Sequence, residues 1–406
     1  MSAAHHQRYK LVGVYTLSAI IRKKSRYTRR QPSFECVALL LQGGGALGAY
    51  QAGVYEALAE ANIHPNWVAG ISIGAINSAL IVGNPPNKRV QRLQEFWEKI
   101  TSNFLGDVAD QFFGSLAKGD WQRGLVSRAS AGLAVTIGAP GFFAPRPVFP
   151  FAHPSGAIEA TSFYDTASLK NTLERLVDFD RINSGAERLS IGAVNVRSGN
   201  FVYFDTNTHE ITPEHVMASG ALPPGFPAVE IDGELYWDGG LVSNTPLEWV
   251  LESEPRQDTL AFQVDLWSAL GKFPGNLADV ETRRKEIQYS SRTRANTDHF
   301  KHVQRLRNTV AALLDDLPAD MKNHFAVEVL RPVAERKAYN IVHLIYRARN
   351  YEGHSKDYEF SRESMLAHWR AGYHDTIRTL RHPHILERPS NHEGVAIFDL
   401  EHDGRD

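Results

Sequence analysis

The continuous apolar run at residues 37–41 predicts a strand buried on both faces, because a strand with one wet face would alternate apolar and polar positions. After the glycines at 43–45, good helix formers predict a helix over residues 49–61. Residues 67–71 then predict a second short strand, and residues 74–81 a second helix. This β-α-β-α order implies adjacent parallel strands joined by a right-handed crossover.

The rest of the chain continues this mixture of strands and helices. Residues 277–315 are highly charged and are predicted to be helical, and Ser361 is placed to cap a last helix. That helix carries an apolar stripe of Leu366, Trp369 or Arg370, Tyr373, Ile377 and Leu380, which indicates core packing rather than a cofactor site. Further strands are predicted at 189–196, 200–204, 229–231, 235–237, 260–266 and 340–346.

Together these elements predict an α/β protein with three layers, α/β/α, and a mostly parallel central sheet. We expect one domain over residues 37–267, followed by a largely helical C-terminal extension over 268–390 and a tail over 391–406. Residues 1–36 are expected to form a basic N-terminal arm without fixed structure.

Composition excludes several classes of protein. The 406 residues are 43% hydrophobic and 22% charged, which is ordinary for a globular protein and excludes a mainly disordered, collagen-like or coiled-coil architecture. Cys36 is the single cysteine, so an intramolecular disulfide, a multi-cysteine zinc site and a cysteine-ligated iron–sulfur cluster are excluded. This favours a reducing compartment and a cytoplasmic location.

Charge is distributed unevenly along the chain. Residues 1–34 hold eight Lys and Arg and no acidic residue. Because the net charge of the whole chain is −2, the residues after position 34 carry a net charge of −10. The acidic body argues against nucleic acid as the main partner, whereas the arm can contact anionic lipid. An apolar run at residues 11–21 is similar to a signal-peptide core but lacks a small-residue cleavage site, and an organellar transit peptide is another interpretation.

Residues 61–87 carry no Asp, Glu, Lys or Arg, but several Pro and Asn residues interrupt them. The purely apolar part, about residues 70–83, is too short to cross roughly 30 Å of hydrocarbon. The stretch therefore predicts a buried strand, turn and helix.

The first chemical motif is Gly70-Ile71-Ser72-Ile73-Gly74, a G-x-S-x-G sequence between a predicted strand and a predicted helix. In this nucleophile-elbow context the flanking glycines permit a tight turn that exposes the serine hydroxyl. The alternative is a glycine-lined turn with a capping serine. The strand–turn–helix context favours a nucleophile at Ser72, with Gly70 and Gly74 as the elbow glycines.

A second motif, Gly43 to Gly48, matches G-x-G-x-x-G after a strand and before a helix. Its amides suit either a dinucleotide pyrophosphate or the oxyanion of an acyl-transfer intermediate. A dinucleotide fold needs an acidic residue about 20 positions later, yet none occurs from Ala61 through Gln94. Adjacent parallel strands bring both loops to one sheet edge, so the glycine amides should lie beside Ser72.

A base is needed to activate Ser72. Asp238 ends a predicted strand and is followed by Gly239 and Gly240, although a simple turn aspartate would fit the same pattern. A Ser-Asp-His order can be built with His299, His343 or His354, but His299 lies in a charged helix and His343 alternates within a strand. We favour a Ser72–Asp238 dyad.

These motifs resemble those of the patatin-like phospholipases. The similarity covers residues 37–267 and includes 218–227, Asn244 and Pro246, while segments around Asp265-Leu266-Trp267 and 351–358 resemble the uncharacterised C-terminal extension of a bacterial subgroup. The resemblance implies Ser72 as nucleophile, Asp238 as base, and an oxyanion hole at Gly43, Gly44, Gly45, Ala46 and Gly48. Leu47 departs from the family, which often has Arg or Lys there.

The function implied is serine acyl-ester hydrolysis in lipid catabolism, of the lipase or phospholipase A type, through an acyl-enzyme and without a metal or organic cofactor. Peripheral contact with a membrane surface is expected, and no nucleic acid. The alternative is a non-catalytic lipid-binding or scaffold protein that retains the fold. A third hypothesis is nucleotide binding at the glycine loop. The absence of an acidic residue about 20 positions after the glycine motif disfavours it.

Residues 131–154 are unusually apolar for a loop. Phe142, Phe143, Phe149 and Phe151 lie among prolines, and Arg146 is the only Lys, Arg, Asp or Glu in the segment. Such a segment predicts either a wall or lid of the acyl-binding site, or a plug of the core.

Overall fold

The computed structural model describes residues 32–102, 131–132, 134–290, 293–348, 352–353 and 355–399. Its strands are β1 Cys36–Leu41, β2 Trp67–Ile71, β3 Ala144–Pro145, β4 Tyr164–Asp165, β5 Arg188–Asn195, β6 Phe201–Asp205, β7 Val229–Ile231, β8 Glu234–Asp238, β9 Thr259–Asp265, β10 Tyr339–Ile345 and β11 Val395–Phe398.

The α-helices are α1 Ala49–Glu60, α2 Ile73–Val82, α3 Pro86–Ile100, α6 Ala167–Leu176, α7 Phe179–Asn183, α8 Pro213–Ser219, α9 Leu247–Glu252, α10 Leu277–Tyr289, α11 Thr293–Asp315, α12 Phe325–Leu330 and α13 Arg362–Thr379. Short 3₁₀ helices are η2 Gly45–Gly48, η4 Pro150–Ala152, η5 Ile158–Thr161, η6 Gly239–Leu241 and η7 Pro383–Leu386.

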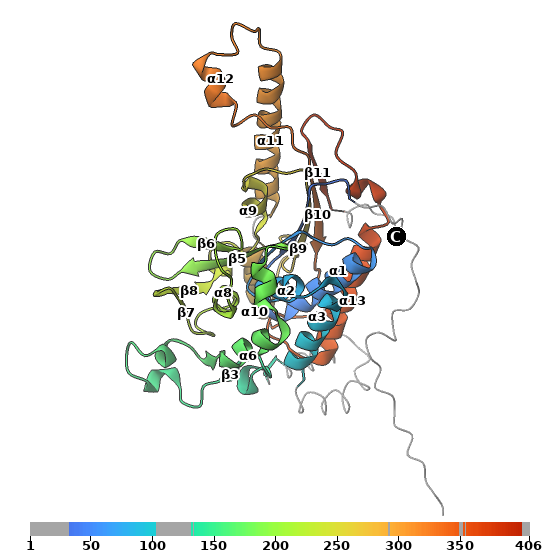
Figure 1. Cartoon of the computed structure of the whole chain (residues 1–406). Coiled ribbons are helices and arrows are strands. Elements are labelled where there is room, and N and C mark those ends of the chain that lie inside the picture. The colour runs from blue at the N-terminus through green and yellow to red at the C-terminus, as the bar shows by residue number, and fades with distance from the viewer. Residues whose placement is uncertain are drawn as a thin grey trace, which may run out of the picture.

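One large sheet organises the described residues (Figure 1). Its order is β11-β10-β9-β1-β2-β5-β8-β7, with β6 paired to β5. The six strands from β11 to β5 run parallel, whereas β6, β7 and β8 pair antiparallel. The mostly parallel sheet predicted from the sequence is therefore confirmed, with an antiparallel portion at one end.

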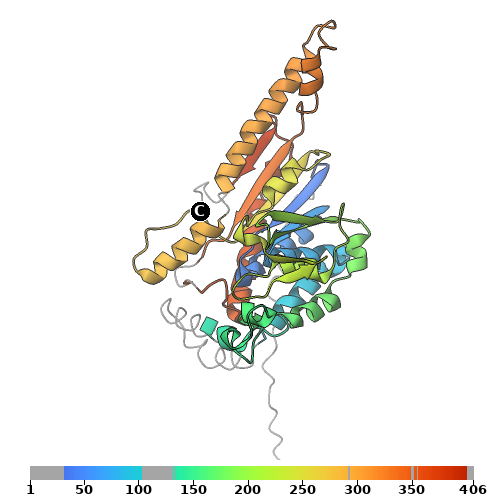
Figure 2. The same cartoon turned by 90° about the vertical axis from the view of Figure 1, so that its left-hand side faces the viewer.

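Alternate side chains of each central strand enter different layers, as the two-residue period of a strand requires. In β1, Leu39 and Leu41 join the core beneath α1, α2 and α13, whereas Ala38 and Leu40 face a second cluster with α9 and α11. Both faces are thus covered by helices, and Figures 1 and 2 show these layers from two sides. The predicted three-layer α/β/α fold is confirmed.

The C-terminal residues contribute helices, as predicted, and they also lengthen the central sheet. β10 pairs in parallel with β9 along its whole length, and β11 pairs with β10. α11 extends away from the sheet and carries α12 at its far end (Figures 1 and 2). Ser361 caps α13 through its side chain, which accepts a hydrogen bond from Ser364 N, as the sequence predicts.

α13 packs closely against α1, so the two ends of the described chain share one core. A Cβ on Gly372 would lie 2.0 Å from Tyr50 O, so the helix backbones come too close there for any larger residue. Polar contacts flank this crossing: Trp369 Nε1 donates to Glu56 at 2.5 Å, and Tyr373 Oη donates to Glu60 at 2.7 Å.

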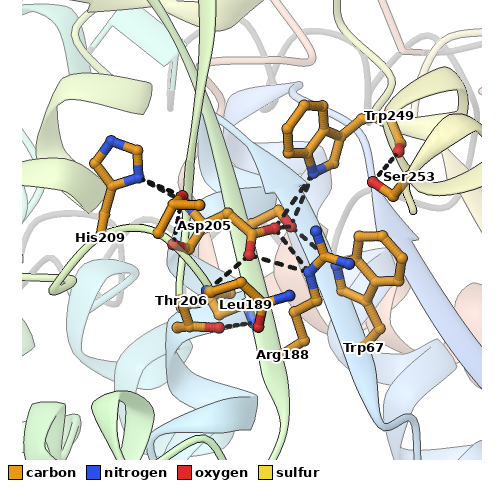
Figure 3. A network of polar contacts seen from close by, with 11 residues as sticks. Trp67, Arg188, Leu189, Asp205, Thr206, His209, Trp249 and Ser253 are labelled. Atoms are coloured by element: carbon orange, nitrogen blue, oxygen red, sulfur yellow. Dashed lines mark hydrogen bonds and ion pairs between the residues drawn. The ribbon is translucent and has the colours of Figure 1, made fainter. Parts of the chain in front are cut away.

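A buried polar network lies where β5 begins (Figure 3). Arg188 Nε donates to both carboxylate oxygens of Asp205 at 3.0 and 2.9 Å, and its guanidinium lies 3.7 Å above the Trp67 ring. Ser190 Oγ also donates to Asp205 at 2.6 Å, and Trp249 Nε1 donates to Ser190 Oγ at 3.1 Å. Because Asp205 is buried, these donors compensate a charge that would otherwise destabilise the fold.

Within the part of the chain that the structure describes, no helix is long and apolar enough to cross a membrane. Residues 61–87, which contain no Asp, Glu, Lys or Arg, form β2, α2, the turns beside them and the first two residues of α3. Most of the predicted N-terminal arm, residues 1–31, lies outside the described residues. The described part of the chain begins at residue 32, just before β1, and in β1 burial raises the pKa of the Cys36 thiol to about 11.

Candidate active site

Ser72 occupies the turn between β2 and α2. Its backbone has φ 57° and ψ −125°, an unusual conformation for a residue with a side chain. The neighbouring glycines permit the turn: a Cβ on Gly70 would lie 2.3 Å from Gly74 O, and a Cβ on Gly74 would lie 2.2 Å from Leu41 O. The G-x-S-x-G motif therefore has the strand–turn–helix geometry of a nucleophile elbow.

Ser219, at the end of α8, holds this strained turn in place. Its hydroxyl accepts a hydrogen bond from Ser72 N at 2.9 Å and donates to Gly192 O at 2.6 Å. The side chain is fully buried. Sequence reasoning included Ser219 only within the family-like segment 218–227, since nothing local links it to a residue 147 positions earlier.

Asp238, the last residue of β8, lies beside Ser72, whose side chain lowers the pKa of its carboxyl group. It also accepts from Gly240 N at 2.7 Å, and its own amide donates to Ala221 O at 3.0 Å. Asp238 is 2% exposed, and this burial raises the pKa of its carboxyl group to about 7, with the Ser72 side chain and the Gly240 amide opposing the rise. Such a group can exchange a proton near neutral pH.

The glycine loop lies beside Ser72, as predicted. Some of its amides already donate hydrogen bonds within the protein, and others do not. Gly43 N donates to Asn244 Oδ1 at 3.1 Å, and Ala46 N donates to Asp357 O at 2.8 Å. Gly44 and Gly45 line the cavity that holds Ser72, and among the described residues their amides have no hydrogen-bond partner. Of the predicted donors, Gly44 and Gly45 are therefore the ones available to a ligand.

The other residues of the glycine loop face inward. Gly48 packs against Ile73 and Trp97, where a Cβ would lie 2.5 Å from Ile73 Cγ1. Leu47 is fully buried in the main core and does not line the cavity. Among the described residues, no Lys or Arg lines the cavity in place of the cation that the family often has at the position of Leu47.

Ser72 and Asp238 line a cavity of about 360 Å³. Its walls are mainly apolar, and polar groups from the C-terminal residues, including Tyr289, Asp357 and Tyr358, form part of the lining. The apolar lining residues are Ile73, Ile76, Ala134, Val135, Phe142, Phe143, Leu222, Pro223, Pro224, Phe226, Trp267 and Phe360. The shape and lining suit an apolar chain whose reactive end reaches Ser72.

The four phenylalanines of residues 131–154 fall into two groups, of which one matches the predicted wall and core and the other matches neither. Phe142 and Phe143 are buried, line the cavity and contact Phe226 and Phe360 edge to face or tilted. Phe149 and Phe151 are instead 76% and 89% exposed. The first pair forms a wall of the cavity, and the second pair lies on the surface of a projecting segment.

Neither described histidine candidate lines the cavity. His299 is exposed on α11, and His343 lies in β10 with Nδ1 3.8 Å from Asp265 Oδ2. His354 lies outside the described residues. Among the described side chains, no three His, Cys, Asp or Glu residues gather in an arrangement that can hold a metal ion.

An elbow serine, a buried aspartate and a glycine loop thus lie together at the carboxyl ends of the parallel strands β1 and β2. A family model described as Patatin-like phospholipase matches residues 39–251, more than half of the chain. The chain belongs to this family. A second model, described as Patatin phospholipase, matches residues 287–392, which include β10 and α13.

Individual relatives are more distant. The chain is 35% identical over 75 residues to the patatin-like phospholipase domain-containing protein M110.7 of Caenorhabditis elegans. That match covers 18% of this chain and 7% of the length of the relative.

Two solved structures are also similar to the chain, each at 16% identity. VipD of Legionella pneumophila has a TM-score of 0.40, with 95% of this chain and 78% of that one covered. ExoU of Pseudomonas aeruginosa, solved in complex with SpcU, has a TM-score of 0.26, with coverage of 74% and 61%.

Proposed function

We propose that the chain hydrolyses acyl esters of lipids with a Ser72–Asp238 dyad. The observation that carries this proposal is the position of Ser72 beside a buried carboxyl group whose pKa is raised to about 7, both in the lining of one apolar cavity. A buried aspartate serving only as a turn residue would not need to face the elbow serine. Membership of the patatin-like phospholipase family supports the same reaction.

In the first half-reaction, Ser72 Oγ attacks the carbonyl carbon of the ester while its proton passes to the Asp238 carboxylate. The amides of Gly44 and Gly45 donate to the oxygen that becomes negative in the tetrahedral intermediate. When the intermediate collapses, Asp238 returns the proton to the departing alkoxide, so an alcohol leaves and an acyl-Ser72 remains. Water then deacylates Ser72, with Asp238 again accepting and returning a proton.

The cavity supports a long acyl chain as the preferred substrate. The segment 144–165, here called the flap, joins these apolar walls, because its penultimate residue Tyr164 lines the cavity. The flap is attached to the cavity wall by Phe163 N to Pro224 O at 3.1 Å and Tyr164 N to Gly225 O at 3.0 Å. It projects from the body of the protein at the lower left of Figure 1.

The exposed side chains of the flap suit a lipid surface. Phe149 and Phe151 are both more than three-quarters exposed, and Val148, Ile158 and Phe163 are exposed as well. Large apolar groups left in water beside an apolar cavity mark a surface that meets an apolar partner. We therefore include peripheral contact of the flap with a lipid surface in the proposed function.

A fluorophosphonate probe tests the dyad directly, because it reacts only with an activated serine. We expect labelling of the wild type and none of Ser72→Ala, together with hydrolysis in a panel of phospholipids, lysophospholipids, acylglycerols and short p-nitrophenyl esters. A folded protein that takes no label and hydrolyses none of these would instead support the non-catalytic lipid-binding alternative. A thermal shift on adding NAD(P) would support nucleotide binding at the glycine loop.

A further inference from the structure

Residues 355–360, here called the strap, cross the glycine loop at its tightest point. Asp357 O accepts the hydrogen bond from Ala46 N at 2.8 Å, and a Cβ on Gly45 would lie 2.1 Å from the same oxygen. The strap follows more than 300 residues after the loop in sequence, and its Tyr358 and Phe360 line the cavity. The C-terminal part of the chain thus reaches the site itself.

Each peptide of the glycine loop is held by at least one hydrogen bond. In a trans peptide the C=O and the following N–H point in opposite directions, so holding the oxygen orients the amide. Gly43 O accepts from Trp267 Nε1 and from Asn244 Nδ2, both at 3.0 Å, and this orients the amide of Gly44. Gly44 O accepts from Leu47 N at 3.2 Å, which orients the amide of Gly45.

The strap fixes the next peptide in the series by accepting the amide of Ala46. That acceptor adds to the 3₁₀ turn of η2 in holding the peptide between Gly45 and Ala46, because Gly45, at φ 55°, has no side chain to restrain it. Two of the hydrogen bonds that hold the loop therefore come from residues beyond β9, namely from Trp267 and from the strap.

Two reciprocal ion pairs attach the strap to α10. Lys285 Nζ lies 2.8 Å from both carboxylate oxygens of Asp357, and Lys356 Nζ lies 2.9 Å from Glu286 Oε1. Lys356 is nearly buried, with its ammonium 5.1 Å from the Trp267 ring centre. Partly buried pairs of this kind fix geometry better than exposed ones, because solvent screens them less.

We propose that Trp267 and the strap are positioning elements of the oxyanion hole, and that the ion pairs with α10 hold the strap in register. The proposal rests on the proposed function. Oxyanion donors act through preorganisation, so a loop free to rotate would bind substrate normally but stabilise the tetrahedral intermediate less well. The C-terminal region would then be part of the catalytic apparatus rather than an appendage.

The first experiment exchanges the charges of one ion pair. Lys285→Asp and Asp357→Lys are each expected to lower kcat about tenfold on a short p-nitrophenyl ester, with KM within about twofold of the wild type. The double variant Lys285→Asp/Asp357→Lys restores an opposite pair and should regain most of kcat. Arg284→Gln is the matched control, since it breaks the exposed pair with Glu281 on the same helix.

The second experiment removes one donor while keeping the ring. Trp267→Phe is expected to lower kcat about tenfold with little change in KM, because Gly43 O loses a hydrogen bond. Melting temperatures accompany every variant, so a loss of kcat that merely follows a loss of fold is recognised.

Single variants with wild-type kcat, or a double variant no better than the singles, would overturn the positioning role. If the wild type itself shows no Ser72-dependent turnover, the proposed function fails instead. The two failures are therefore distinguishable.

Discussion

Ser72 and Asp238 come together because the two strands that carry them end head to head on one edge of β5. β2 pairs with β5 up to Ile71 opposite Gly192, and the antiparallel β8 ends with Asp238 opposite Ala193, the next residue. β6 pairs across residues 190–194 of β5, which places β2 and β8 together on the opposite edge. The reversed direction of β8 thus brings a strand end to the elbow serine.

The dyad predicts non-additive losses. Ser72→Ala and Asp238→Asn should each abolish turnover while the protein stays folded, and the double variant should be no worse than either single one, since the two residues act as a unit. Steady-state rates on a p-nitrophenyl ester measure this. If Asp238→Asn keeps near-normal activity and His354→Ala loses it, the dyad assignment is wrong and the site depends on a histidine.

The raised pKa of Asp238 predicts a pH profile. The carboxylate is the base, so kcat/KM should rise with pH and level off above about pH 7. Rates measured from pH 5 to 9 with a substrate that does not titrate give the midpoint. A profile that stays flat through pH 7 would contradict the assignment of Asp238 as base.

The stability of the fold should fall as pH rises, whereas kcat/KM should increase. The folded protein holds the Asp238 proton up to about pH 7, whereas the unfolded chain releases it near the ordinary value of 3.8. Folding therefore loses stability as pH rises from about 4 to 7, and the loss stays constant above that. Asp238→Asn, which is always neutral, should gain in melting temperature over the wild type across this window. If the difference in melting temperature between Asp238→Asn and the wild type stays the same from pH 4 to 8, the prediction is wrong.

Gly45→Ala should cost at least a hundredfold in kcat. The new Cβ would meet Asp357 O and push the loop from the position in which its amides donate to the oxyanion. Gly185→Ala is the matched control, since Gly185 also has a positive φ, of 75°, but its Cβ would meet no atom within 4 Å. Equal kinetics in the two folded variants would rule out the assigned role of the loop.

The phenylalanines of residues 131–154 should separate into two classes. Phe143→Ser should weaken turnover of a long acyl ester more than of a short one, by about 1–3 kcal/mol in transition-state binding, because Phe143 lines the cavity. Phe149→Ser/Phe151→Ser should leave a soluble ester unaffected and reduce hydrolysis on phospholipid vesicles. Phe325→Ser, on the distant and exposed α12, is the control. Parallel losses on all substrates would indicate a general loss of stability.

The network around Asp205 predicts a stability effect without a catalytic one. Asp205→Ala leaves Arg188 without its carboxylate partner and should lower the free energy of unfolding by about 3–5 kcal/mol. Asp315→Asn removes only an exposed pair with Arg336 and should cost less than about 1 kcal/mol. Urea titrations compare the two variants. Equal midpoints would show that the buried pair adds no stability.

Local patterns were enough to predict many of the elements and the chemical motifs. The apolar run before Gly43, the glycines around Ser72 and the turn at Asp232-Gly233 each depend on neighbours a few residues away, so their structures follow from the sequence. Asp238 was identified as a candidate for the same reason, because a carboxylate at a strand end before two glycines is a local pattern.

Only the tertiary structure decided how these parts meet. The direction and edge of β8 depend on strand pairing between residues about 40 positions apart, and no local pattern specifies such pairing. The contact of Asp357 with the glycine loop uses a backbone carbonyl, which every residue possesses, so no side-chain signal in the sequence could mark it. Ser219 and Trp267 are similar cases, since their partners are backbone atoms brought near by packing of the whole sheet.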